Sequence, residues 1–148
     1  MSKHFDGETL GNTPKAEWPK IYAECGKHKK FGIVVMGESE YITYRQRNWY
    51  KGVCIPTLVK KDENGESKWW WDMELKKECN GLALLKKDIF FFEDQAGNQI
   101  GIGRLTTKNV GRKNMTAFIE EILSKRQEKG WDIDPPDKEL RSKKHAQL

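Results

Sequence analysis

The chain has 148 residues, of which 33% are charged and 36% hydrophobic, and its formal net charge is +5. This length predicts one domain with a hydrophobic core, and the basic balance favours an anionic partner. No apolar run approaches the roughly 18 residues that cross a bilayer, and the N-terminus has no apolar secretion signal. We therefore expect neither a membrane protein nor a secreted one.

Three widely spaced cysteines argue against a disulfide-stapled scaffold and for a reducing, cytoplasmic location. They are Cys25, Cys54 and Cys79. Cys25 and His28 form one pair of potential metal ligands, but no second pair stands at zinc-like spacing. The sequence therefore predicts neither a metal nor another cofactor.

The N-terminal third is expected to hold a flexible arm followed by two strands. Residues 1–20 are polar and interrupted by glycine and proline, which predicts a loose arm. Residues 31–36 form a continuous apolar run rich in β-branched side chains, and residues 38–44 alternate between polar and apolar. These patterns indicate two strands separated by Gly37.

Residues 43–60 are predicted to form the central helix. Thr43 is a suitable N-cap, and Gln46, three residues later, completes a capping box. Pro56 removes a backbone donor and crowds the carbonyl of Gly52, four residues earlier. Either the two residues form a kink, or the helix ends just before Pro56.

This helix is expected to carry one charged half and one apolar half. The second half is apolar nearly all round, which predicts burial in a core or a subunit contact. The first half offers many hydrogen-bond donors and no carboxylate, which suits a phosphate backbone. The candidate binding residues there are Arg45, Gln46, Arg47, Asn48 and Lys51.

Three consecutive tryptophans at 69–71 precede Asp72, the predicted N-cap of a short helix. Adjacent side chains cannot all face one side of a helix or strand, so at least one ring is expected to be exposed. The rings form either a platform for stacking bases or a core and dimer contact. Trp70 and the earlier Tyr50 are the candidate stacking residues.

A hairpin is predicted next. Residues 89–92 read as a buried strand, residues 94–98 have turn composition with Gly97 available for positive φ, and Ile100 and Ile102 mark the return strand.

A second cationic patch spans residues 104–113, which contain four cations and no acid. Its candidate binding residues are Arg104, Thr106, Thr107, Lys108, Arg112 and Lys113. Asn114 is then the predicted cap of the clearest amphipathic helix, which Gly130 ends. The core stripe of this helix is Met115, Phe118, Ile119, Ile122 and Leu123.

The C-terminal segment is expected to be extended. Trp131 and Ile133 should anchor it to the domain, and residues 138–148 should form a basic tail that adds cations without choosing a sequence.

Three blocks resemble the phage lambda NinB (Orf) recombination-protein family: RQRNWYKGVCIP at 45–56, IGRLTT at 102–107, and 114–137. The resemblance implies a small homodimeric domain over residues 21–137 that binds single-stranded DNA in a cleft. It also implies that this domain helps to load recombination proteins onto strands coated by single-strand-binding protein. Gln46 and Lys108 match positions thought to touch DNA in that family. The family's usual serine is Leu105 here.

Two other functions compete with this one. A metal-dependent nuclease or resolvase needs convergent carboxylates. Two acidic clusters exist. One consists of Asp88, Glu93 and Asp94, and the other of Asp132, Asp134 and Asp137. Neither has a recognisable spacing with a lysine or histidine base, so the sequence does not predict an enzyme. The third possibility is a protein-interaction module that docks through its aromatic clusters.

The sequence thus predicts an α+β domain in which a small antiparallel sheet packs with two main helices between loose termini. Its two acid-free patches, distant along the chain, are expected to line one trough for an unpaired DNA strand.

Overall fold

The computed structural model describes residues 3–141, apart from the side chain of Phe90. The fold is α+β, as predicted, with helices and two separate antiparallel hairpins. The chain divides into two compact units, Met1–Val35 and Met36–Leu148. Each unit is described by itself below.

The first unit is a hairpin followed by a helix. Strands β1 (Gly7–Leu10) and β2 (Thr13–Ala16) pair antiparallel around Gly11, whose φ of +63° suits glycine. Helix α1 (Trp18–Gly26) follows with proline in its first turn, where the missing N–H costs no helical hydrogen bond. Regular structure therefore occupies most of the segment for which the sequence predicts a loose arm.

The strand predicted at residues 31–36 is wrong. These residues have no regular structure, and Val35 is 90% exposed. A β-branched run forms a strand only where another strand pairs with it. In the described part of the chain, β1 pairs with β2 and β3 with β4, so this run has no partner.

The strand predicted at residues 38–44 is also wrong, because the central helix already begins there. Helix α2 (Glu38–Trp49) has Gly37 at its N-cap and two glutamates in its first turn, which complement the helix dipole. Thr43 lies inside it and donates from Oγ1 to the Glu40 carbonyl at 2.9 Å instead of capping the helix. Ile42 is buried seven residues before Trp49, so the apolar stripe extends further back than the sequence pattern indicates.

Helical structure continues past Pro56. A π-helical segment, η1 (Tyr50–Cys54), leads into α3 (Ile55–Lys61), and the Ile55 N–H donates to the Tyr50 carbonyl five residues earlier. The proline stands in the first turn of α3, and the wider π turn accommodates the missing donor. The alternative in which the helix ends before Pro56 is therefore wrong.

The three tryptophans lie in α4 (Lys68–Glu78), whose N-cap is Ser67 rather than Asp72. The Ser67 Oγ accepts the Trp70 N–H at 3.1 Å. Trp71 is buried, and its indole Nε1 donates to Asp62 Oδ2 at 2.9 Å, whereas Trp69 is exposed. The expectation that at least one ring is exposed is confirmed. A short helix, α5 (Gly81–Leu84), follows.

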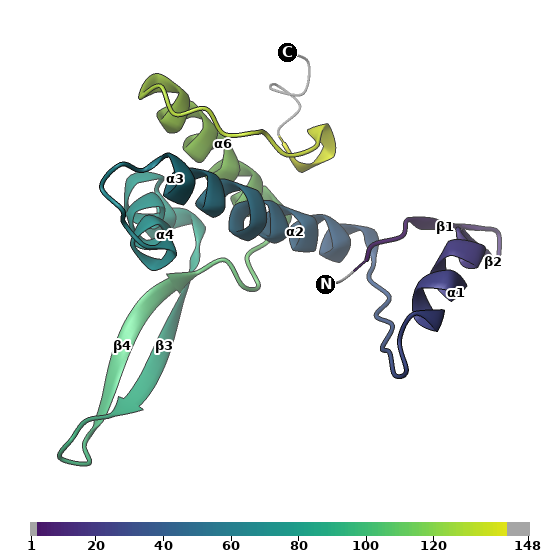
Figure 1. The fold of residues 1–148 in the computed structure, drawn as a ribbon, viewed down its shortest axis with the longest axis horizontal. Helices are drawn as coiled ribbons and strands as arrows, with labels where there is room; N and C mark the ends of the chain where they lie inside the picture. The colour runs from purple at the N-terminus through teal and green to yellow at the C-terminus, as the bar shows by residue number, and fades with distance from the viewer. Residues whose placement is uncertain (1–2, 142–148) are drawn as a thin grey trace. The chain divides into compact units, whose positions relative to one another are not determined.

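The predicted hairpin is present but is not buried. Strands β3 (Lys86–Glu93) and β4 (Gln99–Thr106) pair antiparallel around a turn in which Gly97 has a φ of +82°. The hairpin extends away from the helices of its unit (Figure 1). The described side chains of Ile89, Phe91 and Phe92 are exposed, so the prediction of a buried strand at residues 89–92 is wrong.

Helix α6 (Arg112–Glu128) supplies much of the core. Its N-cap is Gly111 rather than the predicted Asn114, so the helix begins earlier than expected. It ends before Gly130, whose φ is +75°. The core stripe is confirmed, with Leu123 only half-buried. Residues 131–141 then include the short helix η2 (Lys138–Leu140) and are anchored by the buried Ile133. Most of the predicted basic tail, residues 142–148, lies outside the described residues.

Candidate nucleic-acid interface

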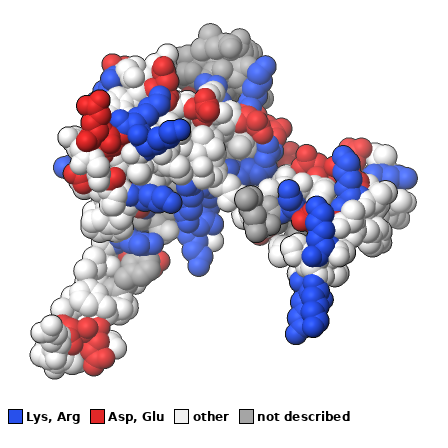
Figure 2. Space-filling model, viewed as in Figure 1, with Lys and Arg blue, Asp and Glu red and all other residues white. Residues whose placement is uncertain are grey.

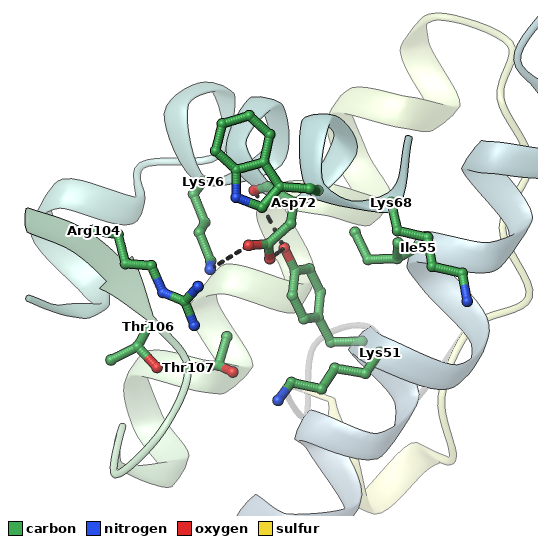
Figure 3. Close-up of a pocket in the computed structure, with 10 residues that line it drawn as sticks. Lys51, Ile55, Lys68, Asp72, Lys76, Arg104, Thr106 and Thr107 are labelled. Carbon is green, nitrogen blue, oxygen red and sulfur yellow. Dashed lines mark hydrogen bonds and ion pairs between the residues drawn. The ribbon is translucent and has the colours of Figure 1, made fainter. Parts of the chain in front are cut away.

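A hollow of about 260 Å³ opens between η1, α4 and the end of β4 (Figure 3). Residues from both predicted cationic patches line it. The lining consists of Tyr50, Lys51, Ile55, Lys68, Trp69, Asp72, Lys76, Arg104, Thr106 and Thr107.

A partly buried polar network fixes one wall of this hollow. The Lys76 ammonium donates to Asp72 Oδ2 at 2.7 Å and to the Leu105 carbonyl at 2.8 Å, which ties α4 to β4. The Tyr50 hydroxyl donates to Asp72 Oδ1 at 2.6 Å. Of the described lining residues, Asp72 alone carries a carboxylate, and Lys76 balances its charge. The described lining thus carries the cations Lys51, Lys68, Lys76 and Arg104 against this one carboxylate, so the lining residues themselves are net positive.

Lys51 experiences that positive potential directly. Partial burial lowers its pKa, and the charges of Arg47, Lys76 and Arg104 lower it further, against an opposing effect of Asp72. Lys51 and Arg104 enter the hollow from opposite walls, the helix and the strand (Figure 3). A bound anion would relieve the repulsion among these cations.

The exposed aromatic ring at the hollow is Trp69, which is 64% exposed. Neither predicted stacking residue presents an exposed ring in the hollow. Tyr50 is buried, so it has no ring face to offer a base. Trp70 lies outside the lining and packs edge-on to Trp71, with ring centroids 5.0 Å apart. The sequence analysis chose Trp70 among the three tryptophans, whereas the ring in the lining is that of Trp69, because helix phase depends on where α4 begins.

Gln46 is a structural residue here. Its side chain is fully buried, and Nε2 donates to Thr116 Oγ1 at 2.9 Å and to the Leu140 carbonyl at 3.2 Å. The capping role predicted for it is wrong, because the helix begins before it. It also presents no surface to a DNA strand, contrary to its place among the candidate binding residues.

Arg45 is occupied by C-terminal acids. Its guanidinium donates to Asp137 at 2.5 Å and to Glu139, and it lies over the Tyr41 ring. Burial lowers the pKa of Arg45. Glu139, Tyr41 and Asp137 raise this pKa by more than burial lowers it, so the net shift is upward. The acids that occupy it lie more than 90 residues along the chain, so no local pattern could reveal them.

The other predicted binding residues fall into two groups. Arg47 is half-buried near Lys51, and Asn48 is exposed on the same helix. Three cations lie outside the lining of the hollow and are exposed at the loop before α6 and in its first turn, namely Lys108, Arg112 and Lys113. The structure thus brings one member of the first patch, Lys51, together with three of the second, Arg104, Thr106 and Thr107.

Two lining cations were missed from sequence, Lys68 and Lys76. The four-residue spacing from Asp72 to Lys76 is a signal for a helical ion pair. That spacing does not show that a strand contributing Arg104 packs beside the pair.

The carboxylates considered for a nuclease are spread apart. Asp94 Oδ1 accepts the N–H groups of Ala96 and Asn98 as part of the hairpin turn. Asp88 lies at the other end of β3, and Asp137 pairs with Arg45. Among residues 3–141, no three His, Cys, Asp or Glu side chains gather closely enough to hold a metal ion.

Comparison with protein-family models, curated proteins and solved structures finds no match for this chain. Within the described residues, no helix combines the length and the apolar character needed to span a bilayer. Function is therefore inferred from the chemistry of the hollow and from the sequence resemblance.

Proposed function

We propose that this chain binds single-stranded DNA, with the hollow between η1, α4 and β4 holding the sugar–phosphate backbone. One observation carries the proposal: Lys51 and Arg104, from cationic segments far apart in sequence, line the same hollow. Its single described carboxylate, Asp72, is already balanced by Lys76. The excess charge suits an anion, and a phosphodiester chain supplies one at every nucleotide.

The lining offers complementary kinds of phosphate contact. The Arg104 guanidinium presents a planar fork that matches two phosphate oxygens, while the Lys51 ammonium acts as a point charge. Thr106 Oγ1 accepts the Lys108 N–H at 3.1 Å, which leaves its hydroxyl proton for a ligand oxygen. These contacts position a backbone without reading its sequence.

Trp69 favours a single strand over a duplex. Its ring is exposed beside the cations, where an unpaired base can stack on it. Bases in a duplex already stack on one another and present only their edges. The combination of a cationic groove with an exposed ring is typical of proteins that bind single strands without sequence preference.

The resemblance to the NinB family supplies the biological role in this proposal. It makes the chain a homodimeric recombination mediator of a phage or mobile element, which helps a recombinase onto strands coated by single-strand-binding protein. Such a role requires strand binding but no bond cleavage.

Fluorescence anisotropy with a labelled oligothymidine, a duplex of equal length and an RNA tests the binding. Affinity should be highest for single-stranded DNA and should fall steeply between about 50 and 200 mM salt. If about four phosphates are neutralised, the log–log slope is about −3. Equal affinity for the duplex, or no response to salt, would contradict the proposal.

Paired variants locate the site. Lys51→Gln combined with Arg104→Gln should weaken binding and make the salt slope shallower by about 1.4, or about 0.7 for each lost contact. Lys60→Gln, an exposed lysine of α3 outside the lining, should leave the slope unchanged. Trp69→Ala should cost about 1–3 kcal/mol of affinity with an unchanged slope, while the neighbouring Trp70→Ala should cost less.

A further inference from the structure

The β3–β4 hairpin carries apolar side chains that nothing in the described structure covers. Phe91 on one face is 69% exposed, and Ile102 on the other is 52% exposed. The sheet has only two strands, and a two-stranded sheet alone is marginally stable in water. A long apolar edge strand of this kind pairs readily with another strand.

We infer that β3 pairs with β3 of a second copy of this chain. The two strands run antiparallel about a twofold axis at residue 90, which gives a four-stranded sheet in the order β4–β3–β3–β4. The inference deepens the homodimeric part of the proposed function by giving it a contact surface; that surface is distinct from the hollow, and the contact does not depend on DNA binding.

Backbone hydrogen bonding sets the alignment of the two strands. Asp94 donates its N–H to the Asn98 carbonyl at 2.9 Å, so even-numbered residues of β3 point their backbone groups toward β4. Odd-numbered residues therefore direct theirs to the open edge. There the Ile89 N–H is met by its neighbour's carboxylate, Asp88 Oδ1, at 2.9 Å. On pairing, this carboxylate must turn away so that Ile89 can bond to the second strand.

Charge complementarity selects a second copy as the occupant. The twofold at residue 90 places Lys87 opposite Glu93 of the second copy, Lys86 opposite Asp94, and Ile89 opposite Phe91. Each of these pairs occurs twice. The basic residues stand at the base of the hairpin and the acidic ones at its tip (Figure 2). Opposite charges directly across two strands stabilise a sheet, and like charges destabilise it.

The same reasoning limits the assembly to two copies. The outer edge of β4 carries Arg104 but no acid, so an antiparallel pair of β4 strands has no charge match. A twofold contact through β3 uses the same patch on both copies and closes on itself.

Charge reversal in the full-length chain tests the contact, with mass measured by sedimentation equilibrium across protein concentration. Lys87→Glu and Glu93→Lys should each raise the dimer dissociation constant about tenfold, because two attractive pairs become repulsive. The double variant should restore it to near the wild-type value. Within one strand these residues are about 20 Å apart, so rescue requires two chains.

A proline pair tests the hydrogen-bonding edge. Ile89→Pro removes an outward N–H from β3 and should abolish the dimer, whereas Gly103→Pro, at the position directly opposite on β4, should leave it intact. Circular dichroism confirms that both variants keep their helices. A wild-type chain that is monomeric at all concentrations, open-ended oligomers, or equal effects of the two prolines would overturn the inference.

Discussion

The helical body of the second unit (α2, η1, α3, α4, α5 and α6) and the β3–β4 hairpin are both rich in apolar residues, but they place them differently. In the body, Phe118 is fully buried and its ring lies 5.4 Å from that of Tyr50. In the hairpin, Phe91 is mostly exposed. An apolar pattern therefore does not by itself decide burial, which depends on whether a second element, in this chain or another, covers the apolar side chains.

The largest expected effect contrasts the two phenylalanines. Phe118→Ala removes a ring from a closed core and should cost about 3–5 kcal/mol of unfolding free energy. Phe91→Ala removes a ring that already faces water and should change that free energy by about 0.5 kcal/mol or less. Urea denaturation at low protein concentration, where the monomer dominates, measures both. A large loss from Phe91→Ala would show that the hairpin packs on the body.

Two glycines extend the comparison to tight packing. A Cβ added at Gly81, in the body, would lie 2.3 Å from the Lys76 carbonyl oxygen, so Gly81→Ala must displace backbone. We expect a loss of about 1–3 kcal/mol. Gly103, in the hairpin, has no atom within 4 Å of that position, so Gly103→Ala should change stability by about 0.5 kcal/mol or less. Thermal melts of the two variants check this, and equal melting temperatures would contradict it.

Strong local signals predicted part of the fold correctly. The stripe of α6, the stop at Gly130 and the hairpin turn at Gly97 each depend on residues within a few positions of one another. Residues 31–44 were predicted wrongly, because their β-branched side chains suit a strand that has no partner. Residues 38–44 instead form the start of α2, where Ile42 is buried, so tertiary packing overrides the local strand propensity there.

The candidate site was predictable as two patches but not as one surface. Lys51 and Arg104 were both singled out, yet their meeting depends on the long-range contact between Lys76 and Leu105. Sequence also could not show that Gln46 and Arg45 are occupied, because their partners come from the other end of the chain. The local sequence around a polar helical residue does not show whether its partner is solvent, DNA or a distant segment of the chain.

The smallest expected effect concerns Gly52, in the π segment of the body. A Cβ there would meet no atom within 4 Å, and its φ is not positive, so alanine fits. Gly52→Ala should therefore stabilise the chain by about 0.5–1 kcal/mol, because alanine loses less backbone entropy in a helix. Urea denaturation measures the change. A loss of stability instead would show that Pro56 requires glycine at position 52, whose carbonyl its ring crowds. In that case the π turn alone would not accommodate the proline.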